Sequence, residues 1–262
     1  MKLFQVDAFT STMFAGNPAF VCLLDEPRDD RWMQTVAREL NAPATAFLRD
    51  DPGGRELRWF APSAQLELCG HGTLATAHVL WETGRLGADE PAEFATPGGR
   101  LTAVRRDGWI ELDFPAMPDE PAPPPSGLAD ALHAAARYVG RSRFDYLVEL
   151  ESEEAVRRVQ PDFQRLRSIQ TRGVIVTSRA SDGNADFVSR FFAPSVGIDE
   201  DHVTGSAHCC LAPFWSRRFG KTRLAARQLS PRGGVLKVAL EGDRVRLAGQ
   251  AVTVMCGELK AQ

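Results

Sequence analysis

Two short glycine-containing segments carry the side chains best suited to chemistry. In the first, Cys69 and His71 flank Gly70, and Gly72 and Thr73 follow. A helix that begins at such a turn presents N–H groups without intrahelical partners and the positive end of its dipole, so it attracts an anion. The same field favours the thiolate of Cys69, and histidine transfers protons near neutral pH. Cys69 and His71 are therefore candidate acid/base groups, with a buried, unreactive thiol as the alternative for Cys69.

The second segment surrounds Gly205 and contains Asp201, His202, Thr204, Ser206 and His208. These side chains are of types that can take part in proton transfer or substrate binding. The histidines and Asp201 show no recognisable metal-ligand spacing, so we expect no metal. Tight packing at a strand-to-helix turn is the alternative explanation for the glycines of both segments.

The two segments follow similar stretches of sequence. Arg58-Trp59-Phe60-Ala61-Pro62-Ser63 precedes the first, and Arg190-Phe191-Phe192-Ala193-Pro194-Ser195 precedes the second. A strand, a proline-containing bend, a glycine turn and a helix thus occur twice in the same order, which predicts an internal duplication.

The elements around these turns predict two α+β domains. Residues 30–40, 73–82 and 128–136 are expected to form helices, and a further helix opens near Ser206. Six prolines between residues 115 and 127 predict a stiff connector. We therefore expect an N-terminal domain over residues 1–116, a linker over 117–127 and a C-terminal domain over 128–262, whose last strand crosses back to the first domain.

The composition of the 262-residue chain is that of a globular protein. Its net charge of −3 and the absence of a basic stripe argue against a nucleic-acid partner. The first residues lack the apolar core of a secretory signal, and no apolar run approaches the roughly 20 residues of a membrane span, so we expect a cytoplasmic protein. Five cysteines without Cys-x-x-Cys spacing argue against a disulfide framework.

The sequence resembles the phenazine-biosynthesis-like (PhzF-like) isomerases, relatives of diaminopimelate epimerase and proline racemase. The resemblance rests on six motifs in order: Val6-Asp7-Ala8-Phe9, Gly16-Asn17-Pro18-Ala19, residues 41–47, Cys69-Gly70-His71-Gly72-Thr73, Val203-Thr204-Gly205-Ser206-Ala207-His208 and Ser230-Pro231-Arg232-Gly233-Gly234. It implies two pseudo-symmetric domains, each a β-barrel-like sheet wrapped around a central helix, with a cofactor-free site between them and a homodimeric assembly.

The resemblance also implies roles for individual residues. Asp201 corresponds to a catalytic or orienting carboxylate, and His71 and Cys69 to further catalytic groups. The implied substrate-binding residues are Asn17, Gly70, Gly72, Thr73, His202, Thr204, Gly205 and Ser206. The racemase relatives use two opposed cysteines, but Thr204 occupies the second position here, so a two-thiol racemase is not expected.

The chain departs from the family pattern at Ala44. The family's principal proton carrier is a glutamate within Asn-Leu-Ser-Glu-Thr-Ala-Phe, whereas residues 41–47 here read Asn-Ala-Pro-Ala-Thr-Ala-Phe. Three interpretations account for Ala44: a natural enzyme whose proton shuttle has moved to other residues, an engineered variant, or a protein that has lost catalysis. His202 is a second departure, because the family usually has proline there.

The resulting hypothesis is a cofactor-free isomerase of specialised metabolism. Its substrate would be a small unsaturated, typically cyclic, amino or carboxylic acid in which a proton or double bond shifts. The alternative is a catalytically impaired family member that binds a ligand or a partner protein.

Overall fold

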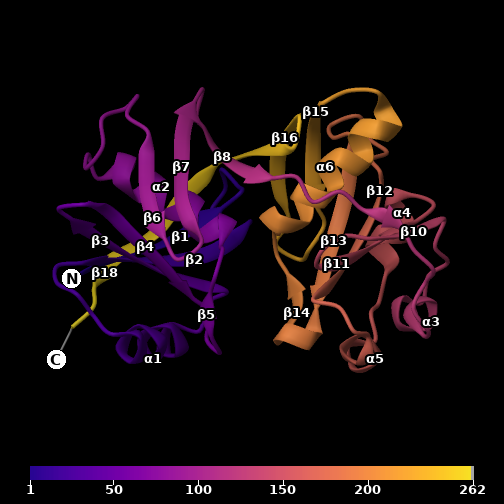
Figure 1. The fold of residues 1–262 in the computed structure, drawn as a ribbon, viewed down its shortest axis with the longest axis horizontal. Coiled ribbons are helices and arrows are strands. Elements are labelled where there is room, and N and C mark those ends of the chain that lie inside the picture. Colours follow the sequence, from indigo (N-terminus) through magenta and orange to yellow (C-terminus); the bar gives the residue numbers. More distant parts are fainter. Residues whose placement is uncertain (261–262) are drawn as a thin grey trace. The chain divides into compact units, whose positions relative to one another are not determined.

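The computed structural model describes residues 1–260, and contacts between Cα atoms divide the chain into two compact units (Figure 1). Unit 1 comprises residues 1–113 and the described part of 248–262, and unit 2 comprises Phe114–Leu247. Among the described helices, none combines the length and apolar character that a membrane span requires.

Unit 1 is a curved sheet with one helix buried against it. Its helices are α1 (Asp30–Leu40) and α2 (Gly70–Glu82). Its strands are β1 (Lys2–Ala8), β2 (Asn17–Leu24), β3 (Ala44–Asp51), β4 (Gly54–Phe60), β5 (Gln65–Leu66), β6 (Ala92–Thr96), β7 (Gly99–Arg106) and β18 (Ala251–Glu258). Helix α2 contacts β1, β2, β3, β7 and β18. It is apolar on nearly every side, as expected of a helix that strands surround.

Unit 2 repeats this organisation around a second buried helix. Two strands begin in one unit and end in the other, namely β8 (Trp109–Pro115) and β17 (Arg244–Gly249). The strands of unit 2 are β9 (Glu120–Pro121), β10 (Tyr138–Arg141), β11 (Asp145–Glu149), β12 (Gly173–Arg179), β13 (Phe187–Ala193), β14 (Ile198–Asp201), β15 (Arg223–Gln228) and β16 (Gly234–Glu241). Its helices are α3 (Leu128–Leu132), α4 (Glu153–Arg158), α5 (Phe163–Ser168), the 3-10 turn η1 (Pro194–Val196) and α6 (Gly205–Phe219).

The strand pairings confirm the predicted pseudo-symmetry. In unit 1, β2 and β3 are parallel, β3 and β4 antiparallel, β4 and β6 parallel, and β6 and β7 antiparallel. In unit 2, β11 and β12 are parallel, β12 and β13 antiparallel, β13 and β15 parallel, and β15 and β16 antiparallel. Helix α2 directly precedes β6 along the chain, and α6 directly precedes β15. The two buried helices therefore occupy equivalent places in this order. The same topology therefore occurs twice in the chain.

Two predicted helix boundaries were wrong. Helix α2 begins at Gly70, three residues before the predicted start, because the side chain of Cys69 caps it. Helix α3 ends at Leu132 rather than at residue 136, because His133 adopts a left-handed conformation with φ of 49°.

Strand β18, which was expected to return to the first domain, belongs to unit 1, since it pairs with β1 from Lys2 to Ala8. The proline-rich segment belongs to unit 2, where Glu120 and Pro121 pair with β10.

Candidate active site

The start of α2 is a turn in which a thiol caps the helix. The Sγ atom of Cys69 accepts the backbone N–H of Gly72 at 3.4 Å. The Nδ1 atom of His71 lies 3.5 Å from the same Sγ. Cys69 is only 4% exposed, whereas His71 is half-buried. A ligand therefore reaches His71 more readily than the thiol.

Thr73 holds this turn from inside the helix. Its Oγ1 donates a hydrogen bond to the carbonyl oxygen of Cys69 at 2.7 Å, and its side chain is fully buried. The hydroxyl thus fixes the cap geometry. Contact between Thr73 and a substrate stays a prediction, as it does for Gly70.

Gly72 is required where the turn meets the sheet. A Cβ atom at this position would lie 2.8 Å from Cδ1 of Trp59 and 3.0 Å from Sγ of Cys69. The Trp59 ring is fully buried, so it has little room to move away. The absence of a side chain at residue 72 lets the indole and the thiol pack directly against the first turn of α2.

We expect Gly72→Ala to destabilise the protein by about 1–2 kcal/mol, the usual cost of overpacking a filled core. Alanine is the better helix former by up to about 1 kcal/mol, so a net loss would show that the steric cost is the larger effect. Urea unfolding of both proteins measures the difference. Gly53→Ala is the matched control, because a Cβ there meets no heavy atom within 4 Å. Stability equal to that of the unsubstituted protein would contradict this account.

Ala44 lies on the α2-facing side of β3. Phe47 packs into the cluster beneath α1, so Ala44 and Ala46, on alternate positions, point to the opposite side of the strand. Ala46 is the register partner of Trp59, whose ring packs against Gly72. A longer side chain at residue 44 would therefore extend on the side of the sheet that α2 covers.

Asn17 shares this face of the sheet. Ala19 is the register partner of Ala44, and Asn17 precedes it by two residues, so their side chains lie on the same side. Asn17 is fully buried at the start of β2. Asn17, Ala44 and the α2 turn thus lie in the same unit, and contact between Asn17 and a substrate stays a prediction.

In unit 2, the start of α6 holds a carboxylate. The Oγ1 atom of Thr204, the residue before the helix, donates a hydrogen bond to Oδ2 of Asp201 at 2.7 Å. Asp201 is half-buried at the end of β14. Because the Thr204 hydroxyl donates to the carboxylate, Thr204 supports Asp201 and is not itself placed as a base.

Gln228 of β15 forms hydrogen bonds with both Asp201 and Thr204, a role that was not predicted from the sequence. Its Oε1 accepts the backbone N–H of Thr204 at 2.9 Å, and its Nε2 donates to the carbonyl oxygen of Asp201 at 2.8 Å. The same Nε2 lies 3.2 Å from Oγ1 of Thr204. Gln228 is only 1% exposed, so its amide holds both residues without competition from water.

The remaining residues of this turn fall into two groups. Gly205 and Ser206 are the first two residues of α6, whose opening N–H groups lack partners within the helix. His202 is half-buried, and its carbonyl oxygen accepts a hydrogen bond from Oγ of Ser230 at 2.7 Å. The predicted motif that begins at Ser230 therefore supports the turn from a separate loop.

His208 is the buried counterpart of Thr73. Its Nδ1 lies 2.8 Å from the carbonyl oxygen of Thr204, so Nδ1 carries the proton, just as Oγ1 of Thr73 donates to the carbonyl of Cys69. Complete burial lowers the pKa of His208 to about 4, with the bond to Thr204 as a smaller opposing effect. His208 is thus neutral near pH 7 and serves to hold the turn.

The cysteines of α6 do not replace the missing second thiol. Cys209 and Cys210 are each 1% exposed, and the Cys209 thiol donates to the carbonyl oxygen of Gly205 at 3.6 Å. Burial raises the pKa of Cys210 well above its usual range. The prediction that they lie too far inside the helix agrees with these positions.

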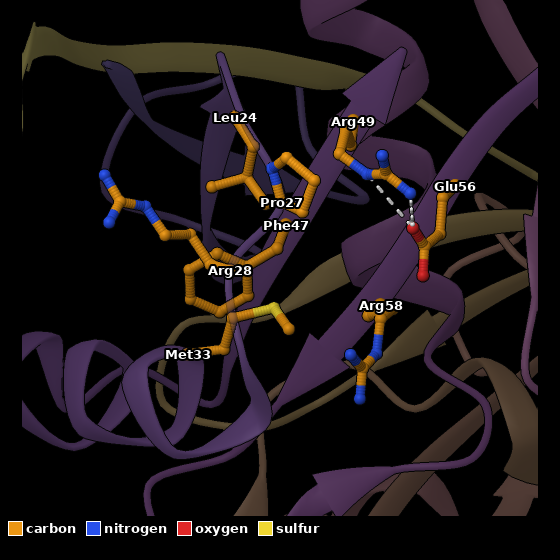
Figure 2. Close-up of a pocket in the computed structure, with 8 residues that line it drawn as sticks. All are labelled: Leu24, Pro27, Arg28, Met33, Phe47, Arg49, Glu56 and Arg58. Carbon is orange, nitrogen blue, oxygen red and sulfur yellow. Dashed lines mark hydrogen bonds and ion pairs between the residues drawn. The ribbon is translucent and has the colours of Figure 1, made fainter. Parts of the chain in front are cut away.

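A pocket of about 190 Å³ in unit 1 contains none of the predicted site residues (Figure 2). Its charged lining consists of Arg28, Arg49, Arg58 and Glu56. Each arginine already faces a carboxylate, for example Arg49 with Glu56 at 2.7 Å. We therefore do not assign this pocket to the substrate.

The structure thus forms two groups of predicted residues, one in each unit. Unit 1 contributes the Cys69 cap, His71, Gly72 and Thr73, with Asn17 and Ala44 on the adjoining sheet face. Unit 2 contributes Asp201, His202, Thr204, Gly205 and Ser206. In each group, a side chain one turn inside the helix donates to the carbonyl of the capping residue.

Comparisons with known proteins place these observations in context. A sequence model described as phenazine biosynthesis-like protein matches residues 6–257. An uncharacterized isomerase of Halalkalibacterium halodurans is 51% identical over 98% of this chain and 97% of its own length. The crystal structure of a phenazine biosynthesis protein of the PhzF family from Enterococcus faecalis is similar, with a TM-score of 0.95 at 38% identity over 99% of each chain. A probable proline racemase from Agrobacterium radiobacter shares the fold, with a TM-score of 0.63 at 12% identity over 100% of this chain and 93% of its own.

Proposed function

Since the chain belongs to the phenazine biosynthesis-like protein family, we propose that it is an isomerase that shifts a proton or a double bond in a small unsaturated amino or carboxylic acid without a cofactor. Relatives that are named isomerases support the reaction class. The observation that carries the proposal is the Asp201 carboxylate beside the start of α6, which accepts a hydrogen bond from Thr204 while Gln228 holds the Asp201 backbone.

In the proposed reaction, Asp201 takes a proton from a carbon of the substrate. The electron pair left behind delocalises into the adjacent unsaturated or carboxyl group, and a proton then returns at a second carbon. Thr204 donates to Oδ2 of Asp201, which keeps the carboxylate in one orientation while it gains and loses the proton. A positioned acid or base of this kind contributes about 100-fold to 10,000-fold to a rate.

His71 is the proposed partner of Asp201. Ala44 has no ionisable group, so the proton carrier that the family places at this position must lie elsewhere in this chain. His71 is half-buried at the α2 turn and stands 3.5 Å from the Cys69 thiol, which orients its ring. We assign it to protonate or orient the substrate.

Isomerisation in deuterated water tests the proposal. With a panel of dienoic and pyrroline-type acids, we expect solvent deuterium at the carbon that receives the proton, measured by NMR and mass spectrometry. Heat-denatured protein is the control for spontaneous exchange. The proposal fails if neither the protein nor Ala44→Glu exchanges any member of the panel. Thermal stabilisation by the same acids without exchange would instead identify a binding protein.

A further inference from the structure

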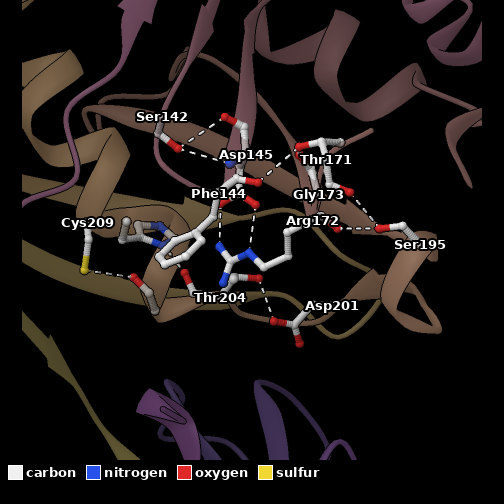
Figure 3. A network of polar contacts seen from close by, with 12 residues as sticks. Ser142, Phe144, Asp145, Thr171, Arg172, Gly173, Ser195, Asp201, Thr204 and Cys209 are labelled. Atoms are coloured by element: carbon white, nitrogen blue, oxygen red, sulfur yellow. Dashed lines mark hydrogen bonds and ion pairs between the residues drawn. The ribbon is translucent and has the colours of Figure 1, made fainter. Parts of the chain in front are cut away.

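Arg172, between α5 and β12, is held rigidly in unit 2 (Figure 3). Its Nε donates to Oδ1 of Asp145 at 2.9 Å, and its Nη2 donates to Oδ2 of the same carboxylate. Its backbone N–H donates to the carbonyl oxygen of Phe144 at 3.1 Å, and its own carbonyl accepts from Oγ of Ser195 at 2.9 Å. Both the backbone and the side chain therefore have a fixed position before any ligand binds.

Two aromatic rings flank the guanidinium. Its central carbon lies 5.0 Å from the ring centre of Phe144 and 5.5 Å from that of Phe191. A Cβ on Gly173 would lie 2.4 Å from the Phe191 ring, so the glycine allows this ring to sit where it does. Phe144 is 37% exposed, which leaves part of its ring open to solvent.

This arrangement places Arg172 near the proposed base. Phe191 and Asp201 are register partners in the β13–β14 pair, so their side chains lie on the same face of the sheet. The guanidinium that packs on Phe191 is thus on the Asp201 side. Figure 3 shows it directed from Asp145 toward the part of the network that holds Thr204 and Asp201.

A second arginine in the same unit shows what a purely structural pair looks like. Arg190 binds Glu200 through Nε and Nη2, and its Nη1 donates to the carbonyl oxygens of Val159 and Val156. Its side chain is 11% exposed. Arg172 makes the same two-pronged contact with Asp145, but among residues 1–260 its Nη1 makes no hydrogen bond, and its side chain is 32% exposed.

The geometry points to Arg172 as the residue that binds the carboxylate of the substrate. This inference rests on the proposed function, which it makes more specific. A guanidinium fork matches a carboxylate. Asp145 is only 2% exposed and lies behind the guanidinium, so it orients Arg172 without taking the open edge.

Titration calorimetry with matched acids and amides tests the inference. The probes are benzoate and cyclohex-1-ene-1-carboxylate, each compared with its amide. We expect the protein to prefer the acids and the double variant Arg172→Gln/Asp145→Asn to lose about tenfold or more of the affinity for the acids, as expected for a charge-assisted contact. Affinity for the amides should not change. Removing both partners avoids leaving Asp145 buried without its cation.

Two further proteins make the result specific. Arg190→Gln/Glu200→Gln carries the equivalent change at the structural pair and should keep the preference for acids. Arg172→Lys retains the charge opposite Asp145 but lacks the fork, so it should bind acids with intermediate affinity. Circular dichroism and the melting temperature check that each variant is folded.

The inference is overturned if the Arg172 double variant binds the acids as tightly as the unsubstituted protein, or if the unsubstituted protein binds acids no more tightly than amides. Its failure is distinct from that of the proposed function. Isomerisation with an unchanged KM in the double variant would reject Arg172 and retain the isomerase. If the preference for acids depends on Arg172 but the protein shows no exchange activity, Arg172 is retained as the carboxylate-binding residue and the isomerase is rejected.

Discussion

Replacing Asp201 by asparagine should lower the rate of solvent-proton exchange by about a hundredfold or more, since that is the usual contribution of a positioned acid or base. The asparagine carbonyl can still accept the hydrogen bond from Thr204, so the turn should keep its shape. Substrate affinity should change little, and kcat should carry the loss. Deuterium incorporation under saturating substrate gives the direct measurement.

Asp199→Asn is the matched control for this substitution. Asp199 lies two residues earlier, its side chain is 58% exposed, and its nearest cation is Arg167 at 3.6 Å. Its removal changes the local charge by the same amount without touching Thr204. Equal losses in both variants would indicate a general electrostatic effect, and a full rate in Asp201→Asn would remove Asp201 from the mechanism.

The second large effect concerns His208 and stability at low pH. Above pH 6.5 this histidine is neutral in both the folded and the unfolded chain. Below pH 6.5 His208 becomes protonated in the unfolded chain, whereas in the folded chain it stays neutral down to about pH 4. The free energy of unfolding should therefore fall as the pH drops through this window, by about 3 kcal/mol in total from this group.

Burial explains why His208 stays neutral in the folded protein. His208 has no exposed surface, and its Nε2 has no hydrogen-bond partner among residues 1–260. A second N–H at that atom would place an unpaired charge in a dry environment.

His208→Asn isolates the contribution, because the asparagine amide can still donate to the carbonyl of Thr204. Urea unfolding between pH 7 and pH 4 should show a shallower loss of stability in this variant than in the unsubstituted protein. His133→Asn, at an exposed histidine, should leave the slope unchanged. Parallel curves for His208→Asn and the unsubstituted protein would contradict the assignment.

Local sequence signals predicted much of the fold. Helix α1 spans the predicted residues because Asp29 caps it, through Oδ1 and the N–H of Trp32 at 2.7 Å, and because Asn41 ends it in a left-handed conformation. Both are short-range features that a reader of the sequence can recognise. The repeated order of strand, bend, turn and helix likewise predicted the duplicated topology.

Strand β15 shows why other elements were missed. Its alternating buried positions are Leu224, Ala226 and Gln228, and a small residue and an amide give a weak apolar pattern. Gln228 matters only because β15 lies parallel to β13, which brings its side chain to Thr204. Arg172 was missed for a related reason, since its relation to Asp201 depends on the registers of β12, β13 and β14. No spacing along the chain reveals these contacts.

The pairing of β1 with β18 has a consequence for the order in which the protein is made. Unit 2 is continuous from Phe114 to Leu247, so all of its strands have been synthesised before β18 emerges from the ribosome. Unit 1 cannot be completed until β18 has been synthesised, and until then one edge of β1 lacks its partner strand. The N-terminal unit is therefore the later of the two to be completed, and during synthesis it exposes a strand edge of the kind that promotes misassembly.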